Sequence, residues 1–414
     1  MILPQEFSTY TSALFGKDRW QRYLQAFKQM PATSIRLNPW KLPSEPVFEQ
    51  MTPVPWCREA YWLNNRPNFT LDPLFHSGVY YVQEAGSLFL DQVLRQYVTS
   101  PVLALDLCAA PGGKSTLMRA ALPQGSVLVC NEPDRRRANI LLENMLKQGH
   151  PDVLVTHNYA QDFAKTNWVF DVILTDVPCS GEGLFRRDES AVKEWSLANV
   201  HYCQKRQRQI LTDIWPCLRP GGLLIYSTCT YNTHENEENV RFVMEELGAE
   251  ILPAFTKPEW QITGSLLKDW AQPVYRFIPG ITQSEGLFMA VLRKKGTPLA
   301  HTFLPTSARR HAQAHPLIHL LSDGIAKPEQ KGKEQIPSAA QALSLDFPAD
   351  TYPRVELTLM QAQRYLHRES FALPNDTPKG FVVVTYKQQP LGFMKNLGDR
   401  ANNLYPKNWA IRSL

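Results

Sequence analysis

The chain has 414 residues, of which 43% are hydrophobic, 20% charged and 11% aromatic; this predicts a soluble globular protein of about two to four domains and excludes a small disulfide-stapled scaffold. The net charge is +5, and this excess lies after residue 300, where 14 Lys and Arg stand against 9 Asp and Glu. A basic C-terminal part of this kind is compatible with a polyanionic partner, but it is also common on an ordinary solvated surface.

Neither a membrane span nor a secretion signal is evident in the sequence. The chain lacks a run of roughly 18 apolar residues, and its first residues are neither basic nor strongly apolar. The 7 cysteines are widely spaced, odd in number and without a CxxC pattern, so neither a disulfide framework nor a metal site is indicated. We therefore expect a cytoplasmic protein without a membrane partner, and no oligomer is indicated.

The pattern of apolar residues divides the chain into parts. Residues 1–90 are rich in proline and aromatic residues and predict a small mixed α/β module. Residues 91–295 alternate short apolar runs with stretches of helical periodicity. The runs predict buried strands at 102–105, 126–129, 153–155, 172–174 and 223–226, and the stretches predict helices at 114–122, 135–148, 190–218 and 235–247. This order is typical of a doubly wound, mostly parallel α/β sheet of the Rossmann-like kind, to which 287–292 adds a last strand.

The remaining residues predict a connection followed by a second domain. Residues 296–348 are rich in Ala, His, Pro, Gln, Ser and Lys and predict a linker. Residues 349–414 resume the apolar pattern, with strands expected at 381–384 and 391–393. We expect a compact, mainly β domain there.

A glycine-rich turn indicates a bound cofactor. Residues 106–116, Asp-Leu-Cys-Ala-Ala-Pro-Gly-Gly-Lys-Ser-Thr, follow the first predicted strand of the sheet and precede a helix. Small residues let the backbone approach a ligand, and the helix N-terminus offers unpaired N–H groups. The end of this segment is similar to an NTPase phosphate-binding loop, but that motif needs a glycine where this chain has Cys108. The other candidate cofactor is S-adenosylmethionine.

Glu132 favours the second candidate. A nucleoside cofactor needs a carboxylate at the end of the second strand, where it accepts hydrogen bonds from both ribose hydroxyls, and Glu132 stands there. Taken alone, an acid at this position is better explained by its interaction with the positive end of the following helix dipole. The glycine-rich turn upstream reverses that preference.

Two cysteines and an aspartate follow further strands of the predicted sheet. Asp176 and Cys179 come after the strand at 172–174, and Cys229 comes just after the strand at 223–226. Ligands bind outside the carboxyl ends of such strands, so these residues should share one crevice with Cys108 and Glu132. C5 of cytosine becomes nucleophilic only after a thiolate adds to C6, and a carboxyl group at N3 stabilises the charge that develops on the ring. Two thiols, an acid and a methyl-donor site therefore point to cytosine-C5 methylation.

These motifs resemble the NOL1/NOP2/Sun family of RNA cytosine-C5 methyltransferases, and within it the bacterial F type of ribosomal RNA methyltransferase. The resemblance covers nearly the whole chain and is carried by residues 34–38, 78–85, 106–114, 176–183, 227–230 and 235–237. It implies an RNA substrate, expected to be 16S ribosomal RNA or the small ribosomal subunit. It also implies RNA-binding roles for residues 1–90 and 349–414, on either side of a methyltransferase domain.

The resemblance assigns roles to individual residues. The methionine end of S-adenosylmethionine is expected against Cys108, Ala109, Ala110, Pro111, Gly112, Gly113 and Lys114, with the ribose at Glu132 and Asp176 facing both cofactor and base. Cys229 is the expected nucleophile, and Cys179 is expected to assist elimination. DNA cytosine-C5 methyltransferases instead use the cysteine of a Pro-Cys turn, here Cys179, so chemistry alone leaves the two roles open.

One departure from the family concerns the adenine. Family members usually have an Asp after the third strand, where this chain has Tyr159. Either Asn158 or Asp162 takes over the adenine contact, or the affinity for the cofactor is lower. A rival function for the whole chain is a ribosome assembly factor that binds RNA and cofactor without turnover. The joint presence of Asp176, Cys179 and Cys229 argues against that rival.

Overall fold

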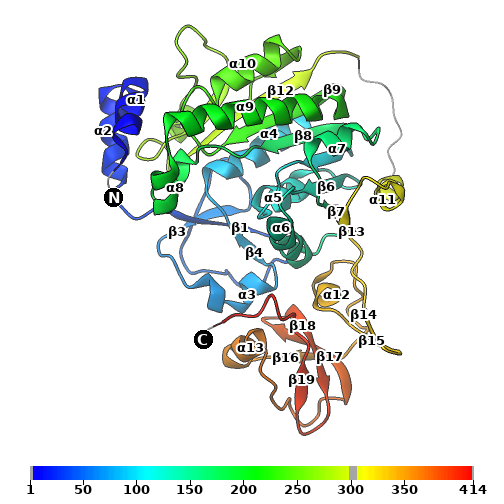
Figure 1. The fold of residues 1–414 in the computed structure, drawn as a ribbon. Helices are drawn as coiled ribbons and strands as arrows, with labels where there is room; N and C mark the ends of the chain where they lie inside the picture. The colour runs from blue at the N-terminus through cyan, green and yellow to red at the C-terminus, as the bar shows by residue number, and fades with distance from the viewer. Residues whose placement is uncertain (1–2, 298–304, 413–414) are drawn as a thin grey trace.

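The computed structural model describes residues 3–297 and 305–412. Within these ranges a nine-stranded sheet forms the centre of the molecule, with four-stranded sheets in the N-terminal and C-terminal parts (Figure 1). No helix in the described ranges is long and apolar enough to cross a membrane.

The central sheet has the strand order β10-β12-β9-β8-β5-β6-β7-β13, and β11 pairs with β12. Its parallel strands are β5 (Leu103–Asp106), β6 (Val127–Asn131), β7 (Val153–Thr156), β8 (Phe170–Asp176) and β9 (Leu218–Thr228). Its antiparallel strands are β10 (Ala249–Leu252), β11 (Val274–Phe277), β12 (Leu287–Lys294) and β13 (Leu320–Ser322). The predicted strands and the mostly parallel order are confirmed.

Helices cover both faces of this sheet, as its apolar strands require. One face packs against α4 (Phe89–Tyr97), α5 (Gly113–Ala121) and α6 (Arg135–Gln148), and the other against α7 (Ala160–Ala164), α9 (Leu197–Ile214) and α10 (Glu237–Glu245). The helix expected at 190–218 is divided into α8 (Glu189–Glu194) and α9, because Ser196 caps a new N-terminus through its bond to the Asn199 amide. The doubly wound α/β class is confirmed.

The N-terminal module consists of a small sheet and helices. Its elements are α1 (Gln5–Phe15), α2 (Lys17–Ala26), β1 (Thr33–Leu37), β2 (Met51–Pro53), β3 (Ala60–Leu63), α3 (Pro73–His76) and β4 (Tyr80–Val82). Buried polar bonds join it to the sheet's helices. Asn38 Nδ2 donates to the Gln148 carbonyl at 3.1 Å and Lys41 Nζ to the Lys147 carbonyl at 2.7 Å. Two side chains of the module thus bond carbonyls at the C-terminal end of α6.

The C-terminal domain contains β16 (Arg354–Glu356), α13 (Leu359–Leu366), β17 (Gly380–Tyr386), β18 (Gln389–Asn396) and β19 (Ala401–Asn403). It contacts the N-terminal module directly, since Gln363 Nε2 donates to the Leu71 carbonyl at 3.0 Å and Tyr405 Oη lies 3.3 Å from His76 Nδ1. The two strands predicted here are confirmed as β17 and β18.

The prediction of a linker over 296–348 is wrong for the part that the structure describes; residues 298–304 lie outside it. This part forms α11 (Pro305–Ala314), β13, β14 (Glu329–Lys331), β15 (Glu334–Ile336) and α12 (Ala339–Leu343). β13 pairs antiparallel with β7, with Leu320 opposite Thr156, and Leu343 packs in the core of the C-terminal domain. A few apolar residues are enough to order this segment, because it packs against β7 and the C-terminal domain. Its amino-acid composition does not reveal those contacts.

Candidate active site

The glycine-rich loop runs from the end of β5 to the start of α5. Gly112 has φ +113°, a conformation that side-chain-bearing residues rarely adopt, and a Cβ there would lie 3.3 Å from Leu141 Cδ1. The loop is held from outside, because Asn144 Nδ2 donates to the Pro111 carbonyl at 2.8 Å and Arg137 to the Ala110 carbonyl at 2.9 Å. The backbone is thereby shaped for close approach of a ligand to the α5 N-terminus.

Glu132 lies just beyond β6 and is only 2% exposed. Its Oε1 accepts from the Asp134 amide at 3.1 Å, whereas Oε2 accepts no hydrogen bond from any described residue and has only an ion-pair contact of 3.5 Å with Arg137. A buried carboxylate oxygen without a hydrogen bond is costly. The ribose hydroxyls of S-adenosylmethionine would supply the missing donors, so this residue fits the expected cofactor.

A pocket opens at the ends of β6 and β7, and Cys108 and Tyr159 are among the residues that line it. Burial, together with the charges of Glu132, Asp106 and Asp176, raises the pKa of Cys108, which therefore lines the pocket as a neutral thiol. The ends of β5, β6 and β8 lie side by side, because β5 pairs with both β6 and β8, as expected.

Of the three candidates for the adenine contact, two have other partners. The Asn158 side chain bonds the backbone of the segment before β13, and Asp162 Oδ2 accepts from the Tyr159 amide at 2.9 Å at the start of α7. The Tyr159 residue is 62% exposed and borders the pocket.

Asp176 ends β8 and accepts two side-chain bonds. Ser227 Oγ donates to Oδ1 at 2.7 Å, and Lys114 Nζ lies 2.8 Å from Oδ2. Burial alone would lower the pKa of Lys114, but the ion pair with Asp176 outweighs it and the pKa is raised. The lysine, predicted to hold the cofactor, is therefore a charged group beside Asp176.

Cys179 and Cys229 are brought together from the turns that follow β8 and β9. Their Sγ atoms are 3.2 Å apart. The hydrogen bond to Cys229, followed by burial and by electrostatic interactions with Cys229 and Glu235, raises the pKa of Cys179 well above its usual range. Cys179 consequently keeps its proton, and the two thiol groups are within hydrogen-bonding distance of each other.

Two buried glutamates fix this pair of turns, and neither was predicted from the sequence as a residue of the site. Glu235 accepts from the Ser180 amide at 3.0 Å and from Gln207 Nε2 at 2.7 Å; Glu182 accepts from the Asn232 amide at 3.0 Å. Asn232 Nδ2 bridges both carboxylates, at 2.8 Å and 3.0 Å. The signal available in the sequence was two acids within short segments next to the cysteines.

Comparison with known proteins matches successive parts of the chain to one group. The 16S rRNA methyltransferase RsmB/F family matches residues 99–293, the N-terminal domain of 16S rRNA methyltransferase RsmF residues 3–85, and the RsmF methyltransferase PUA domain residues 352–411. A protein of Enterobacter sp. (strain 638) named ribosomal RNA small subunit methyltransferase F is 30% identical over 98% of this chain and 96% of its own length. One of the same name from Erwinia tasmaniensis is 28% identical over 94% and 93%.

Solved structures show the same fold. The crystal structure of NSun6 from Pyrococcus horikoshii with SFG has a TM-score of 0.60 at 20% identity, over 71% of this chain and 99% of that one. A methyltransferase homolog from the same organism has a TM-score of 0.57 at 25% identity, over 70% of this chain and 100% of that one. With the match along nearly its whole length to the Enterobacter relative, the chain belongs to the RsmB/F family of 16S rRNA methyltransferases, which use S-adenosylmethionine.

Proposed function

We propose that this protein transfers a methyl group to C5 of a cytosine in RNA, and that this RNA is 16S ribosomal RNA or the small ribosomal subunit. The observation that carries the proposal is the 3.2 Å approach of Cys179 Sγ and Cys229 Sγ beside the Lys114–Asp176 ion pair. A non-catalytic assembly factor would not need this arrangement.

Cys229 is the nucleophile in this proposal. The Lys114 ammonium group and the thiol proton of Cys179 both stabilise a thiolate at Cys229. Attack forms a bond from Cys229 Sγ to C6 of the base, and the displaced electron pair makes C5 nucleophilic. The proton shared by Lys114 Nζ and Asp176 Oδ2 is available to stabilise the charge that develops at the ring nitrogen N3.

S-Adenosylmethionine, when bound, supplies the electrophilic methyl group. Residues Cys108 to Lys114 would hold its methionine end and Glu132 its ribose. Product release then requires a base that takes the C5 proton; the electron pair of that C–H bond restores the C5–C6 double bond, and the Cys229 sulfur leaves as a thiolate. Cys179, hydrogen-bonded to that sulfur, is the group placed to stabilise it as the S–C6 bond breaks.

RNA contact outside the active site is assigned to both ends of the chain. Residues 352–411 match a PUA domain, and the chain's positive excess lies after residue 300. The C-terminal domain also touches the N-terminal module, so one RNA can run across both. We assign residues 1–90 and 349–414 to RNA binding on this basis.

The proposal is tested with Cys229→Ala and Cys179→Ala, each incubated with S-adenosylmethionine and 16S ribosomal RNA that lacks the modification. Cys229→Ala should form no covalent adduct and transfer no methyl group. Cys179→Ala should accumulate a protein–RNA adduct that survives a denaturing gel, because addition is intact and elimination is blocked. Cys203→Ala, at a buried cysteine on α9, is the control and should behave as the wild type.

An adduct with Cys229→Ala and none with Cys179→Ala would reverse the two roles. If the wild type transfers no methyl group to unmodified 16S ribosomal RNA, whether free or assembled in the small subunit, the proposed function is rejected. Bisulfite sequencing of RNA from strains with and without the protein would identify the modified cytosine. The modification should be absent from the strain that lacks the protein, and it should return when the wild-type protein, but not Cys229→Ala, is supplied.

A further inference from the structure

The turns that carry Cys179 and Cys229 are bonded to each other next to both sulfur atoms. The Gly183 amide donates to the Cys229 carbonyl at 2.8 Å. Ser180 Oγ, one residue after Cys179, lies 2.9 Å from Thr230 Oγ1, one residue after Cys229. These bonds fix the two backbones relative to each other, so the cysteine side chains face each other from anchored positions.

The two sulfur atoms are already close to bonding distance. Cys179 Sγ and Cys229 Sγ are 3.2 Å apart, whereas the S–S bond of a disulfide is about 2.0 Å long. Small changes in the side-chain torsion angles supply a difference of this size. Both cysteines are partly exposed, so a small reagent reaches them from solvent. The fully buried cysteines are Cys57, Cys130, Cys203 and Cys217.

The pair combines a reactive sulfur with a second thiol beside it. Lys114, which is paired with Asp176, and the thiol of Cys179 both stabilise a thiolate at Cys229, and the thiolate is the form of cysteine that oxidants attack. Cys179 stands where a resolving cysteine stands, because a neighbouring thiol converts the first oxidation product of a cysteine into a disulfide. The pair is therefore arranged for oxidation as well as for addition to a base.

We propose that a peroxide oxidises Cys179 and Cys229 to a reversible disulfide, and that this disulfide switches methyl transfer off. The loss of activity rests on the proposed function, in which Cys229 is the nucleophile. Formation of the disulfide does not rest on it, because it follows from the positions and exposure of the two sulfur atoms.

The oxidation takes two steps. In the first, the Cys229 thiolate attacks one oxygen of hydrogen peroxide; an S–O bond forms, the O–O bond breaks, and the departing hydroxide takes up the proton that Cys229 had lost. In the second, Cys179 Sγ attacks Cys229 Sγ; the S–S bond forms, the S–O bond breaks, and the Cys179 proton leaves with the hydroxide as water. Two thiols and one peroxide thus give one disulfide and two water molecules, and the two electrons that the sulfur atoms lose reduce the peroxide.

The disulfide both blocks and protects the nucleophile. While Cys229 Sγ is bonded to Cys179 Sγ it cannot add to C6 of a base. A thiol reductant restores both thiols by exchange through a mixed disulfide. Without Cys179, peroxide would oxidise Cys229 further to a sulfinic acid, which thiols do not reduce. Reversibility is therefore the property that Cys179 provides.

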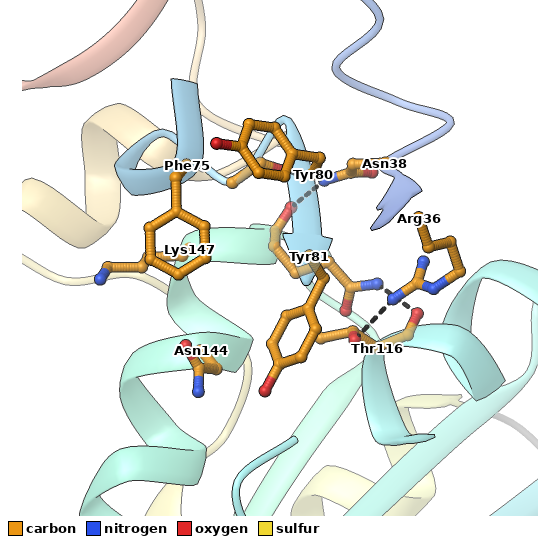
Figure 2. Close-up of a pocket in the computed structure, with 10 residues that line it drawn as sticks. Arg36, Asn38, Phe75, Tyr80, Tyr81, Thr116, Asn144 and Lys147 are labelled. Atoms are coloured by element: carbon orange, nitrogen blue, oxygen red, sulfur yellow. Dashed lines mark hydrogen bonds between the residues drawn. The ribbon is translucent and has the colours of Figure 1, made fainter. Parts of the chain in front are cut away.

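The cofactor loop is held by contacts that do not involve the cysteine turns. Arg36 Nη2 of the N-terminal module donates to Thr116 Oγ1 at 2.7 Å (Figure 2), and Thr116 Oγ1 donates to the Gly113 carbonyl at 3.0 Å at the start of α5. Asn144 Nδ2 on α6 holds the Pro111 carbonyl. The oxidised protein should therefore still bind S-adenosylmethionine, which distinguishes the switch from unfolding of the site.

The test treats the wild type, Cys179→Ala and Cys203→Ala with hydrogen peroxide, under conditions that fully oxidise free cysteine, and then with or without dithiothreitol. Peptide mapping without reduction should find the Cys179–Cys229 disulfide in the wild type and in Cys203→Ala, the control at a buried cysteine. Methyl transfer by both to 16S ribosomal RNA should fall in proportion to the oxidised fraction and return with dithiothreitol. Calorimetry should give the same affinity for S-adenosylmethionine before and after oxidation. Cys179→Ala should instead carry a sulfinic acid at Cys229 that dithiothreitol does not remove.

Free thiols at both cysteines of the peroxide-treated wild type would overturn the proposal, as would a disulfide between other cysteines. Unchanged methyl transfer by the fully oxidised wild type would overturn it too. If dithiothreitol returned Cys229 of Cys179→Ala to the thiol as completely as in the wild type, Cys179 would not be the partner. A wild type that forms the disulfide but transfers no methyl group even when reduced would reject the proposed function and leave the disulfide assignment standing.

Discussion

Asn158 Nδ2 donates to the backbone carbonyl of Leu317 at 2.6 Å, and Asn158 Oδ1 accepts from the His319 amide at 3.1 Å. The side-chain amide therefore holds the segment before β13 against the end of β7. One N–H of the amide and one lone pair of its oxygen are used to hold that segment. Among the three candidates for the adenine contact, Tyr159 is the aromatic residue, and it lines the pocket.

We therefore expect Tyr159→Ala to weaken S-adenosylmethionine binding about tenfold, through loss of a stacking surface for the adenine. Tyr159→Phe should bind the cofactor nearly as well as the wild type. Calorimetric titration measures both, and Tyr202→Ala, at a tyrosine on α9 that is 64% exposed, is the matched control. An affinity unchanged in Tyr159→Ala would contradict this assignment.

Glu132→Gln is expected to weaken cofactor binding by about 10- to 100-fold, because two charge-assisted hydrogen bonds from the ribose are replaced by weaker ones. The same titration measures it. Glu259→Gln removes a carboxylate whose side chain is 67% exposed and should have no effect. Equal affinities for Glu132→Gln and the wild type would show that the ribose binds elsewhere.

Glu235 predicts a specific pH dependence of stability. Burial, together with the charge of Glu182, raises its pKa from 4.5 to about 7. Between these two values the folded protein binds more protons than the unfolded chain, so the free energy of unfolding falls as pH rises from about 4.5 to 7. Glu235→Gln should remove this part of the fall, on the order of 2 kcal/mol.

Urea unfolding at pH 5 and pH 8 measures that difference. The wild type should lose more stability than Glu235→Gln between the two conditions. Asp106 and Glu285, whose pKa values burial also raises to about 7, contribute a fall that both proteins share. Parallel changes in wild type and variant would mean that Glu235 does not titrate in this window.

Arg276 and Glu237 form an ion pair whose side chains are 1% and 0% exposed. Arg276 Nη1 also donates to the Tyr231 carbonyl at 2.6 Å, so the pair fixes the chain two residues after Cys229. Glu237→Gln leaves a buried cation without its counter-charge and should lower the free energy of unfolding by about 3–5 kcal/mol.

Urea unfolding again provides the measurement. Glu250→Gln, which breaks the solvent-exposed pair of Glu250 and Arg293, should cost less than about 1 kcal/mol. Adding Arg276→Met to Glu237→Gln should restore part of the loss, because the unpaired buried charge is then gone. A loss for Glu237→Gln as small as that for Glu250→Gln would contradict the role assigned to the buried pair.

The C-terminal domain should account for part of the salt dependence of RNA binding. Lys379, Arg400 and Lys407 are exposed, and the described residues show no ion pair for them. Replacing all three by Ala should weaken binding at low salt and reduce the slope of log Kd against log salt, by up to about 0.7–0.9 for each phosphate that the protein no longer neutralises. The control replaces three exposed basic residues of the methyltransferase domain by Ala, namely Lys165, Arg241 and Lys268, and should alter the slope less. Equal slopes for both triple variants would assign no special role to the C-terminal charges.

Local sequence rules predicted the central fold well because its elements are defined by neighbouring residues. The helix expected at 135–148 is observed as Arg135–Gln148, since the Asp134 side chain caps its first turn and Gly149 adopts the left-handed conformation that ends it. The strand-end rule likewise located Asp176, Cys179 and Cys229.

Features that depend on distant partners escaped those rules. β13 has only three residues and forms because β7 offers an edge to it. Glu235 and Glu182 support the cysteine turns through bonds to residues about fifty positions away, so their positions near the cysteines in sequence do not by themselves reveal this role. The protonated state of Cys179 also depends on a neighbour that only folding supplies.

The pairing of β13 with β7 has a consequence for how the protein is made. On the ribosome, the parallel strands emerge long before residue 320, so the outer N–H and C=O groups of β7 remain without their partner strand until the C-terminal part follows. Such an open edge invites pairing with other chains. A protein cut after residue 295 would keep the cofactor loop and both cysteines. It would still be prone to aggregate, because β13, which covers the edge of β7, would be missing.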